Sequence, residues 1–135
     1  MKTALSPKLT DELKRSARQA AAQAYAPYSR FQVGAAVLCG DSVYTGVNVE
    51  NASYGLSICA ERSAIFNAVA HGALRIDAIC VYTPTSAPVT PCGACLQVFA
   101  EFGRDALIVC CTDEDKAERR YAVADLLPAA FRLQK

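Results

Sequence analysis

The stretch CAERSAIFNAVAHGALRIDAICVYTPTSAPVTPCGACLQVFAEFGRDALIVCC, residues 59–111, decides the fold because helical and strand-like patterns alternate along it. Helices are predicted at 60–71 and 92–102, each followed by a glycine that ends the helix. The apolar runs at 76–82 and 106–111 are typical of buried strands. This alternation indicates an α/β sandwich built on a mixed sheet.

On the N-terminal side of this stretch we expect one helix and a strand hairpin. Ser6 can cap a helix that begins at Pro7 and that Pro27 ends. Apolar residues at 31–39 predict a buried strand. A Gly-Asp turn then returns the chain as a second strand at 42–47.

The C-terminal side adds two short elements. Residues 119–122 predict a fifth strand, and residues 123–127 predict a helical turn. The predicted fold is therefore a three-layer α/β/α sandwich with a mixed five-stranded sheet, in a single domain that spans residues 1–135.

Composition and charge narrow the classes of function. The chain has 135 residues, of which 53% are hydrophobic and 20% are charged, and its net charge is +1. This near-neutral charge gives no electrostatic basis for binding long nucleic acids. No apolar run reaches the ~18 residues of a membrane span. We therefore expect neither nucleic acid nor a membrane as a partner.

The cysteine content points to a reducing compartment. The chain holds seven cysteines, an odd number, and its N-terminal residues show no signal-peptide core. A chain of this length folds without a disulfide framework. We expect reduced thiols and a cytoplasmic location.

Three of the cysteines form two short motifs that predict a zinc site. Cys59 opens the motif CAER at 59–62, and Cys92 and Cys95 lie in the motif PCGAC at 91–95. Both motifs fall at predicted helix starts, where unpaired N–H groups and the helix dipole favour the thiolate form. Three protein ligands leave one zinc coordination position for water, which is typical of a catalytic site.

Two charged residues beside Cys59 complete the predicted chemistry. Glu61 lies two residues from the ligand, where it can move a water proton without binding the metal, as the non-ligand Glu does in zinc deaminases. Three thiolates around Zn²⁺ leave a net charge of −1, which weakens the metal as a Lewis acid. Arg62 can offset this charge by hydrogen bonding to the ligand sulfurs. We therefore predict Glu61 as the proton shuttle and Arg62 as a supporting residue.

The other cysteines and the histidine have simpler interpretations. The cysteines predicted as small hydrophobic residues of the strands are Cys39, Cys80, Cys110 and Cys111. The last two are adjacent and should point to opposite faces of the sheet. His71 follows Cys59 by twelve residues, ~18 Å along a helix, so it cannot ligate the same ion. A lone CxxC can also be a redox pair, but that interpretation leaves the motif CAER unexplained.

The two motifs together resemble those of the small, homotetrameric cytidine deaminases. The likeness runs over nearly the whole chain. The further matching segments are YAPYSRFQVGAA at 25–36, NVENASYG at 48–55, and LLP at 126–128 followed by Phe131. One departure is Leu96, where relatives usually carry arginine.

The resemblance assigns roles to residues around the predicted metal site. Phe31 would pack on the pyrimidine, and the main chain of Ala60 would contact the base carbonyl. Asn48 and Glu50 would hydrogen-bond the ribose hydroxyls, and their i, i+2 spacing suits two groups on one side of an extended segment. The residues that would reach a neighbouring subunit's site are Ala52, Tyr54 and Phe131.

The resemblance also implies an activity. It is the hydrolytic deamination of cytidine and deoxycytidine to uridine and deoxyuridine, with release of ammonia, in pyrimidine salvage. The expected cofactor is one Zn²⁺ per chain, and the expected assembly is a homotetramer.

Two alternatives to the cytidine deaminase function remain open. One is a deaminase of a modified cytosine nucleoside such as blasticidin S, and the other is a non-catalytic zinc or redox module. Arg62 and the ending LLP with Phe131 favour cytidine over the modified nucleoside. The preference between cytidine and deoxycytidine stays open.

Overall fold

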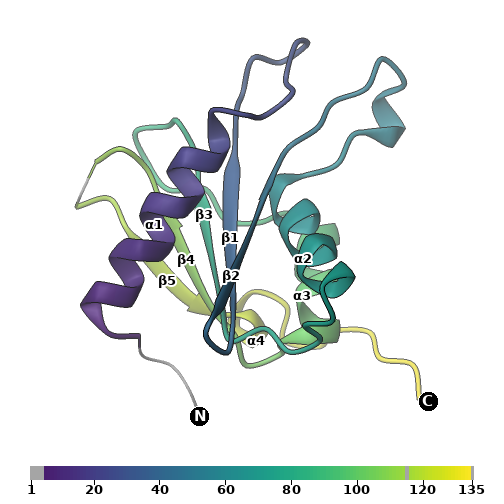
Figure 1. The fold of residues 1–135 in the computed structure, drawn as a ribbon. Helices are drawn as coiled ribbons and strands as arrows, with labels where there is room; N and C mark the ends of the chain where they lie inside the picture. The colour runs from purple at the N-terminus through teal and green to yellow at the C-terminus, as the bar shows by residue number, and fades with distance from the viewer. Residues whose placement is uncertain (1–4, 115, 135) are drawn as a thin grey trace.

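A five-stranded sheet forms the centre of the molecule (Figure 1). The computed structural model describes residues 5–114 and 116–134. In their order across the sheet, the strands are β2 (Ser42–Val47), β1 (Gly34–Cys39), β3 (Ala78–Tyr82), β4 (Leu107–Cys111) and β5 (Arg119–Ala122). β3 and β4 are parallel, whereas the other neighbouring pairs are antiparallel. The predicted mixed five-stranded sheet is confirmed.

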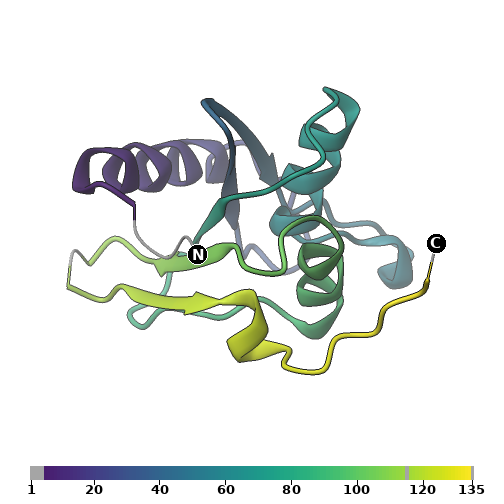
Figure 2. The ribbon, with the colours of Figure 1, turned by 90° about the horizontal axis from the view of Figure 1, so that it is seen from below.

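Helices cover both faces of the sheet. α1 (Pro7–Ala21) packs on one face, whereas α2 (Ala60–Ala70) and α3 (Gly93–Phe102) pack on the other. Figure 2 shows α1 and α3 on opposite sides of the strands. Two short helical segments are η1 (Tyr54–Leu56) and α4 (Val123–Leu126). The predicted α/β/α layering is confirmed. Within the described residues, no helix combines the length and the apolar character that a membrane crossing requires.

The strand side chains alternate between two apolar cores. In β4, Ile108 and Cys110 join the core under α2 and α3, whereas Val109 and Cys111 join the core under α1. Successive side chains of a strand point to opposite faces, so the predicted separation of Cys110 and Cys111 is confirmed. Like the other cysteines, both are free thiols.

Two glycines let helices lie close on the hairpin of β1 and β2. A Cβ at Gly46 would lie 2.2 Å from the backbone N of Ala64 in α2, and a Cβ at Gly34 would lie 2.0 Å from the carbonyl O of Ala17 in α1. Side chains cannot approach backbone atoms so closely, so both positions require glycine. The position of α2, and of Cys59 directly before it, therefore depends on Gly46.

α1 is shorter than predicted. Ser6 caps it as expected, but the helix ends at Ala21 instead of continuing toward Pro27. Beyond the helix, Tyr25 forms a β-bridge with Val49, in the segment that follows β2. The backbone of Tyr25 thus finds its partners at Asn48 and Glu50, far along the chain, which a local pattern of apolar residues does not reveal.

β1 begins at Gly34, three residues later than predicted. The side chain of Asn48 replaces the strand ladder before that point. Its Nδ2 donates to the carbonyl O of Phe31 at 2.7 Å, and its Oδ1 accepts from the N–H of Val33 at 2.8 Å. The other predicted helices and strands agree with the observed bounds to within two residues.

Candidate metal centre and active site

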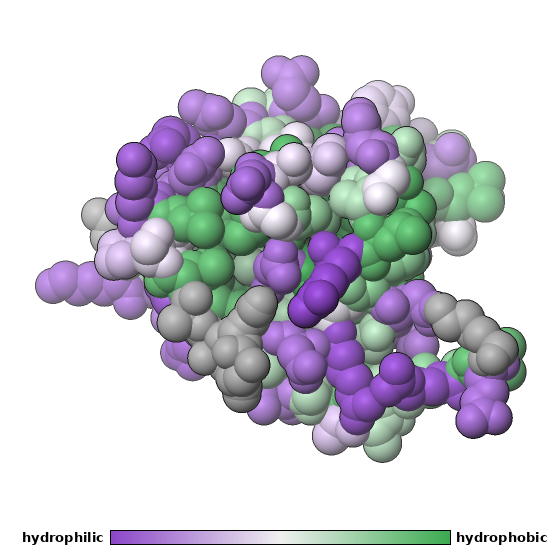
Figure 3. Space-filling model, turned by 60° about the horizontal axis from the view of Figure 1, so that its bottom comes forward, coloured by the Kyte–Doolittle hydropathy of each residue, from purple (hydrophilic) through white to green (hydrophobic). Residues whose placement is uncertain are grey.

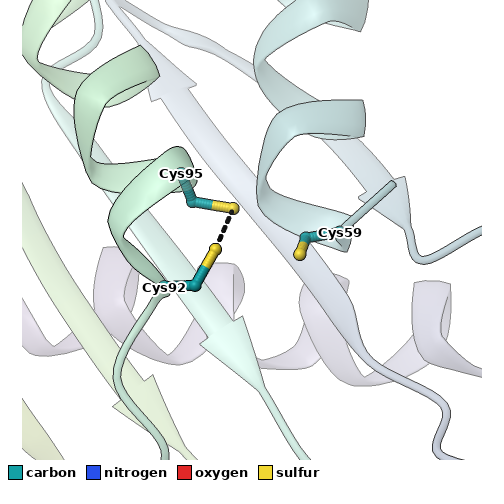
Figure 4. A group of neighbouring side chains, drawn as sticks. All are labelled: Cys59, Cys92 and Cys95. Carbon is teal, nitrogen blue, oxygen red and sulfur yellow. Dashed lines mark hydrogen bonds between the residues drawn. The ribbon is translucent and has the colours of Figure 1, made fainter. Parts of the chain in front are cut away.

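Three cysteine sulfurs lie together where α2 and α3 begin. Cys59 directly precedes α2, Cys92 directly precedes α3, and Cys95 lies in the first turn of α3. Their Sγ atoms all lie within 4.8 Å of one another. Figure 4 shows the three side chains converging from the two helix starts. The structure thus brings together all three predicted zinc ligands.

The sheet topology explains why the two helix starts meet. β2 and β3 run in the same direction because both are antiparallel to β1. α2 follows β2 and α3 follows β3, so both helices begin beyond the C-terminal ends of these strands, and they pack on the same face. Crevices beyond the C-terminal ends of strands are the usual place for ligands in such sheets.

The sulfur spacing fits a tetrahedral metal ion. The Sγ atoms of Cys92 and Cys95 lie 3.6 Å apart, and sulfurs that bind one zinc at about 2.3 Å lie about 3.8 Å apart in a tetrahedron. Among the described residues, no fourth His, Cys, Asp or Glu joins this group, so the protein leaves one coordination position for water. A redox pair of Cys92 and Cys95 would not account for the third sulfur, of Cys59.

Cys95 and Arg62 together favour the thiolate form of Cys59. Its Nη2 lies 3.5 Å from the Sγ of Cys59, and its Nε is buried without a hydrogen-bond partner among the described residues. The pKa of Cys59 falls to about 5, first because the thiol of Cys95 hydrogen-bonds to it and then because Arg62 does so. In turn, the hydrogen bond to Cys59 raises the pKa of Arg62 further.

Glu61 lies in the first turn of α2 and lines a cavity beside the sulfurs. It is 6% exposed, although glutamate is seldom buried without a partner. Burial raises the pKa of its carboxyl group to about 7. A carboxyl group with this pKa can both take up and release a proton near neutrality.

The cavity has a volume of about 310 Å³, which suits a small-molecule ligand. It gathers residues that are far apart in the sequence. Those that the sequence analysis predicted are Phe31, Asn48, Glu50, Cys59, Ala60, Glu61 and Cys92. Cys95, the third member of the sulfur cluster, and Arg62, which contacts Cys59, do not line the cavity.

Sequence reasoning missed the rest of the lining, which is mostly apolar or hydroxyl-bearing. These residues are Val33, Ser57, Ile58, Val81, Thr83, Val89 and Thr90. The position of Val81 and Thr83 at the C-terminal end of a strand was an available signal. Val89 and Thr90 belong to a Pro-containing loop whose course no periodic pattern fixes.

Asn48 and Glu50 both line the cavity, but they also hold the loop that precedes β1. Asn48 bonds the backbone of residues 31 and 33. Glu50 Oε1 accepts from the N–H groups of Tyr28 at 3.0 Å and Ser29 at 3.1 Å. The hydroxyl and the N–H of Ser29 lower the pKa of Glu50, so Glu50 is a carboxylate, an acceptor with lone pairs left for a ligand.

The residues predicted to act on a neighbouring subunit lie outside the cavity. Tyr54 is 78% exposed and Phe131 is 69% exposed. Ala52 is exposed in the loop before η1, which projects from the molecule in Figure 1. The amide of Gln97 in α3 donates to the carbonyl O of Phe131 at 3.0 Å and anchors the C-terminal segment. Leu96 is buried in the core, where a neutral side chain packs well.

Comparison with a family of known proteins gives a match over most of the chain. The family described as "cytidine and deoxycytidylate deaminase zinc-binding region" matches residues 7–111. This range includes both cysteine motifs, Glu61 and Arg62.

Individual relatives and solved structures agree with this match. A cytidine deaminase of Halalkalibacterium halodurans is 49% identical over 120 residues, which cover 88% of this chain and 91% of that protein. One from Mycobacterium tuberculosis is 44% identical over 122 residues, covering 90% and 88%. The crystal structure of a cytidine deaminase from Burkholderia pseudomallei superposes with a TM-score of 0.85 at 46% identity and covers 90% of this chain and 98% of that one.

Proposed function

Because the chain belongs to the cytidine and deoxycytidylate deaminase family, we propose that it catalyses the zinc-dependent hydrolytic deamination of cytidine and deoxycytidine. The products are uridine or deoxyuridine and ammonia. One observation carries this proposal: the buried carboxyl group of Glu61 lines the same cavity as Cys59 and Cys92, two of the three clustered thiols.

In the proposed enzyme, Cys59, Cys92 and Cys95 hold one Zn²⁺ per chain. The bound ion supplies a Lewis acid that lowers the pKa of a water molecule to ~7, so that hydroxide is available at neutral pH. Arg62 withdraws negative charge from the thiolates through its contact with Cys59.

Glu61 moves the protons of the reaction. As a carboxylate it accepts a proton from the attacking water, and as a carboxylic acid it gives that proton to N3 of the pyrimidine. Protonation of N3 makes C4 more electrophilic. The oxygen of the deprotonated water bonds to C4. Glu61 then takes the remaining proton of that hydroxyl group and passes it to the amino group, so that the C4 carbonyl forms, the C4–N bond breaks and ammonia leaves. Burial, which raises the pKa of Glu61 to about 7, lets one carboxyl group serve both as base and as acid.

The remaining cavity residues bind the nucleoside. Phe31 packs on the pyrimidine, and the main chain of Ala60 contacts the base carbonyl. Asn48 and Glu50 hydrogen-bond the ribose hydroxyls. The support for these roles is that all four residues line the cavity with Glu61 and that Glu50 is a carboxylate.

The charges around the cavity favour a nucleoside over its 5′-phosphate. The described residues that line the cavity include two carboxylic residues, Glu50 and Glu61, but neither Lys nor Arg. Phosphate groups in proteins are bound by Arg, Lys or helix N-termini. The two helices next to the cavity, α2 and α3, begin directly after Cys59 and Cys92, so the proposed thiolates would already supply the negative charge that these N-termini favour.

A substrate panel with ammonia release as the readout tests the proposed function. We expect kcat/KM for cytidine and deoxycytidine to exceed that for CMP and dCMP by about fivefold to several hundredfold, because like charges about 4 Å apart repel by about 1 to 4 kcal/mol and every 1.4 kcal/mol is a factor of about ten. Blasticidin S is the control for a modified nucleoside. Equal rates on CMP, or turnover of blasticidin S alone, would contradict the proposal.

We also propose a homotetramer whose sites are shared between subunits. Large apolar side chains remain exposed near the cavity loops and at the C-terminal end, among them Tyr54, Leu56, Phe131 and Leu133. Figure 3 shows apolar surface gathered in patches on one face of the molecule. Exposed apolar patches of this kind mark interaction sites. In this proposal Ala52, Tyr54 and Phe131 reach the neighbour's cavity. We further propose that residues 1–135 form a single domain and that the protein is cytoplasmic.

Mixed assemblies test the shared site. Phe131→Ala and Glu61→Gln chains, each inactive alone, should recover activity when mixed, because some sites then combine an intact Glu61 with an intact Phe131 from a neighbour. Light scattering should give about four chain masses, as the family resemblance implies, and co-purification of differently tagged chains verifies the mixing. A fully active monomer, or verified mixing without recovered activity, would contradict a role of Phe131 across the interface.

A further inference from the structure

The loop between α1 and β1 is held by side chains instead of by strand pairing. Asn48 and Glu50, from the segment after β2, bond its backbone at residues 28, 29, 31 and 33. Arg30, at the centre of the loop, has φ = 61°, a left-handed conformation that an arginine adopts only when its surroundings impose it. The shape of this loop is therefore set by a few specific contacts.

The hydroxyl group of Ser29 joins two of the proposed substrate-binding residues. This hydroxyl donates to Oε2 of Glu50, and the hydroxyl oxygen of Ser29 accepts from the N–H of Phe31 at 3.0 Å. The backbone N–H of Ser29 donates to the other carboxylate oxygen of Glu50 at 3.1 Å. One side chain thus connects the residue proposed for the ribose with the residue proposed for the base.

We propose that Ser29 is a positioning residue for nucleoside binding, which fixes the carboxylate of Glu50 and the ring of Phe31 in one arrangement. This inference rests on the proposed function, because it takes its meaning from the roles of those two residues. Ser29 itself does not line the cavity that contains the sulfurs. It lines a neighbouring hollow of about 300 Å³, which shares Glu50 and Ser57 with that cavity.

The contacts separate this role from ordinary stabilisation of a turn. A turn serine usually bonds only its own backbone neighbours, whereas Ser29 also donates to a charged group that lies 21 residues away in the chain. Hydrogen bonds to charged groups are the stronger ones. Without the Ser29 hydroxyl, Glu50 keeps two backbone donors on Oε1 but loses the donor on Oε2, and the N–H of Phe31 loses its acceptor. The carboxylate is then held through one oxygen alone, and Phe31 is no longer connected to it.

The test compares Ser29→Ala with Ser29→Thr in steady-state kinetics on cytidine. Ser29→Ala should raise KM about tenfold with kcat changed by less than about twofold, because a hydrogen bond to a charged group is lost from the binding site alone. Ser29→Thr retains a hydroxyl and should stay within about twofold of the parent in both constants. Ser6→Ala is the matched control, since it removes a serine that caps α1 far from the cavity; it should lower the melting temperature and leave KM unchanged.

A double variant shows whether Ser29 acts through Glu50. The KM of Ser29→Ala/Glu50→Gln should lie close to that of Glu50→Gln alone, because residues that act through one contact have non-additive effects. The inference would be overturned if the increases in KM of the two single variants multiplied in the double variant. It would also be overturned if Ser29→Ala left KM unchanged while Glu50→Gln raised it. Neither result would contradict the proposed function. An unchanged KM in Glu50→Gln itself would instead contradict the ribose role in the proposed function.

Discussion

Glu61→Gln should leave the protein folded and zinc-loaded but lower kcat for cytidine by at least ~10³, or roughly 4 kcal/mol of barrier lowering. Gln has the same shape as Glu but cannot carry a proton. Among the described residues that line the cavity, the other carboxylate is Glu50, and its oxygens are bonded to the loop before β1. The variant should therefore bind substrate and stop before proton transfer.

Elemental analysis and steady-state kinetics on the same preparation check this result. Arg62→Gln is the matched comparison, because it alters the adjacent residue and removes the contact with Cys59 without removing a proton carrier. It should retain zinc and lose less activity than Glu61→Gln. A Glu61→Gln enzyme within tenfold of the parent would show that the proton shuttle lies elsewhere, and an Arg62→Gln enzyme with unchanged activity at every pH would reject the supporting role of Arg62.

Glu61 and the three cysteines could be predicted from the sequence because the required information is local. Cys92 and Cys95 are three residues apart at one helix start, and Glu61 is two residues from Cys59. Only the meeting of the two helix starts is non-local. The structure provides this meeting, because α2 and α3 follow β2 and β3, which run in one direction.

The loop before β1 could not be predicted, for an equally physical reason. Apolar residues continue from 31 into the strand, so the sequence favours an earlier start of β1. The structure instead satisfies the backbone there with the side chain of Asn48, which lies 15 residues from Val33 in the chain. Side-chain contacts across such separations leave no periodic signal. For the same reason, neither the early end of α1 nor the contact of Ser29 with Glu50 was expected.

The environment of Glu61 likewise emerged only from the structure. Its position in the first turn of α2 follows from the sequence, but its burial comes from the packing of α2 on the sheet, where the neighbouring Ala60 and Ala64 join the apolar core. That packing brings the carboxyl group out of water and raises its pKa to about 7. The raised pKa of Glu61 is therefore a consequence of tertiary structure, whereas its identity as the proton shuttle could be predicted from its spacing to Cys59 in the sequence.

Cys95→Ser should abolish zinc binding and lower kcat/KM for cytidine at least about 10⁴-fold, because the metal supplies several kcal/mol of transition-state stabilisation. Cys95 is fully buried in the first turn of α3 and contributes one of the three sulfurs. A hydroxyl is a weak zinc ligand at neutral pH, since zinc sites are built from thiolate, imidazole and carboxylate. Two remaining sulfurs should not retain the ion against a chelator.

Cys39→Ser is the matched control for this loss, because Cys39 is a half-buried free thiol at the end of β1 and is not part of the sulfur cluster. It should keep one zinc per chain by elemental analysis and nearly full activity. Glu61→Gln distinguishes metal binding from proton transfer, since this variant should keep the metal and lose catalysis. If Cys95→Ser remained active without zinc, catalysis would not depend on the metal. If Cys95→Ser kept its zinc, or if Cys39→Ser lost zinc to the same degree as Cys95→Ser, the assignment of the ion to Cys59, Cys92 and Cys95 would be wrong. We expect the parent protein to retain zinc and Cys95→Ser alone to lose both zinc and activity. This result would place the ion at the start of α2 and α3, beside the carboxyl group that moves the protons.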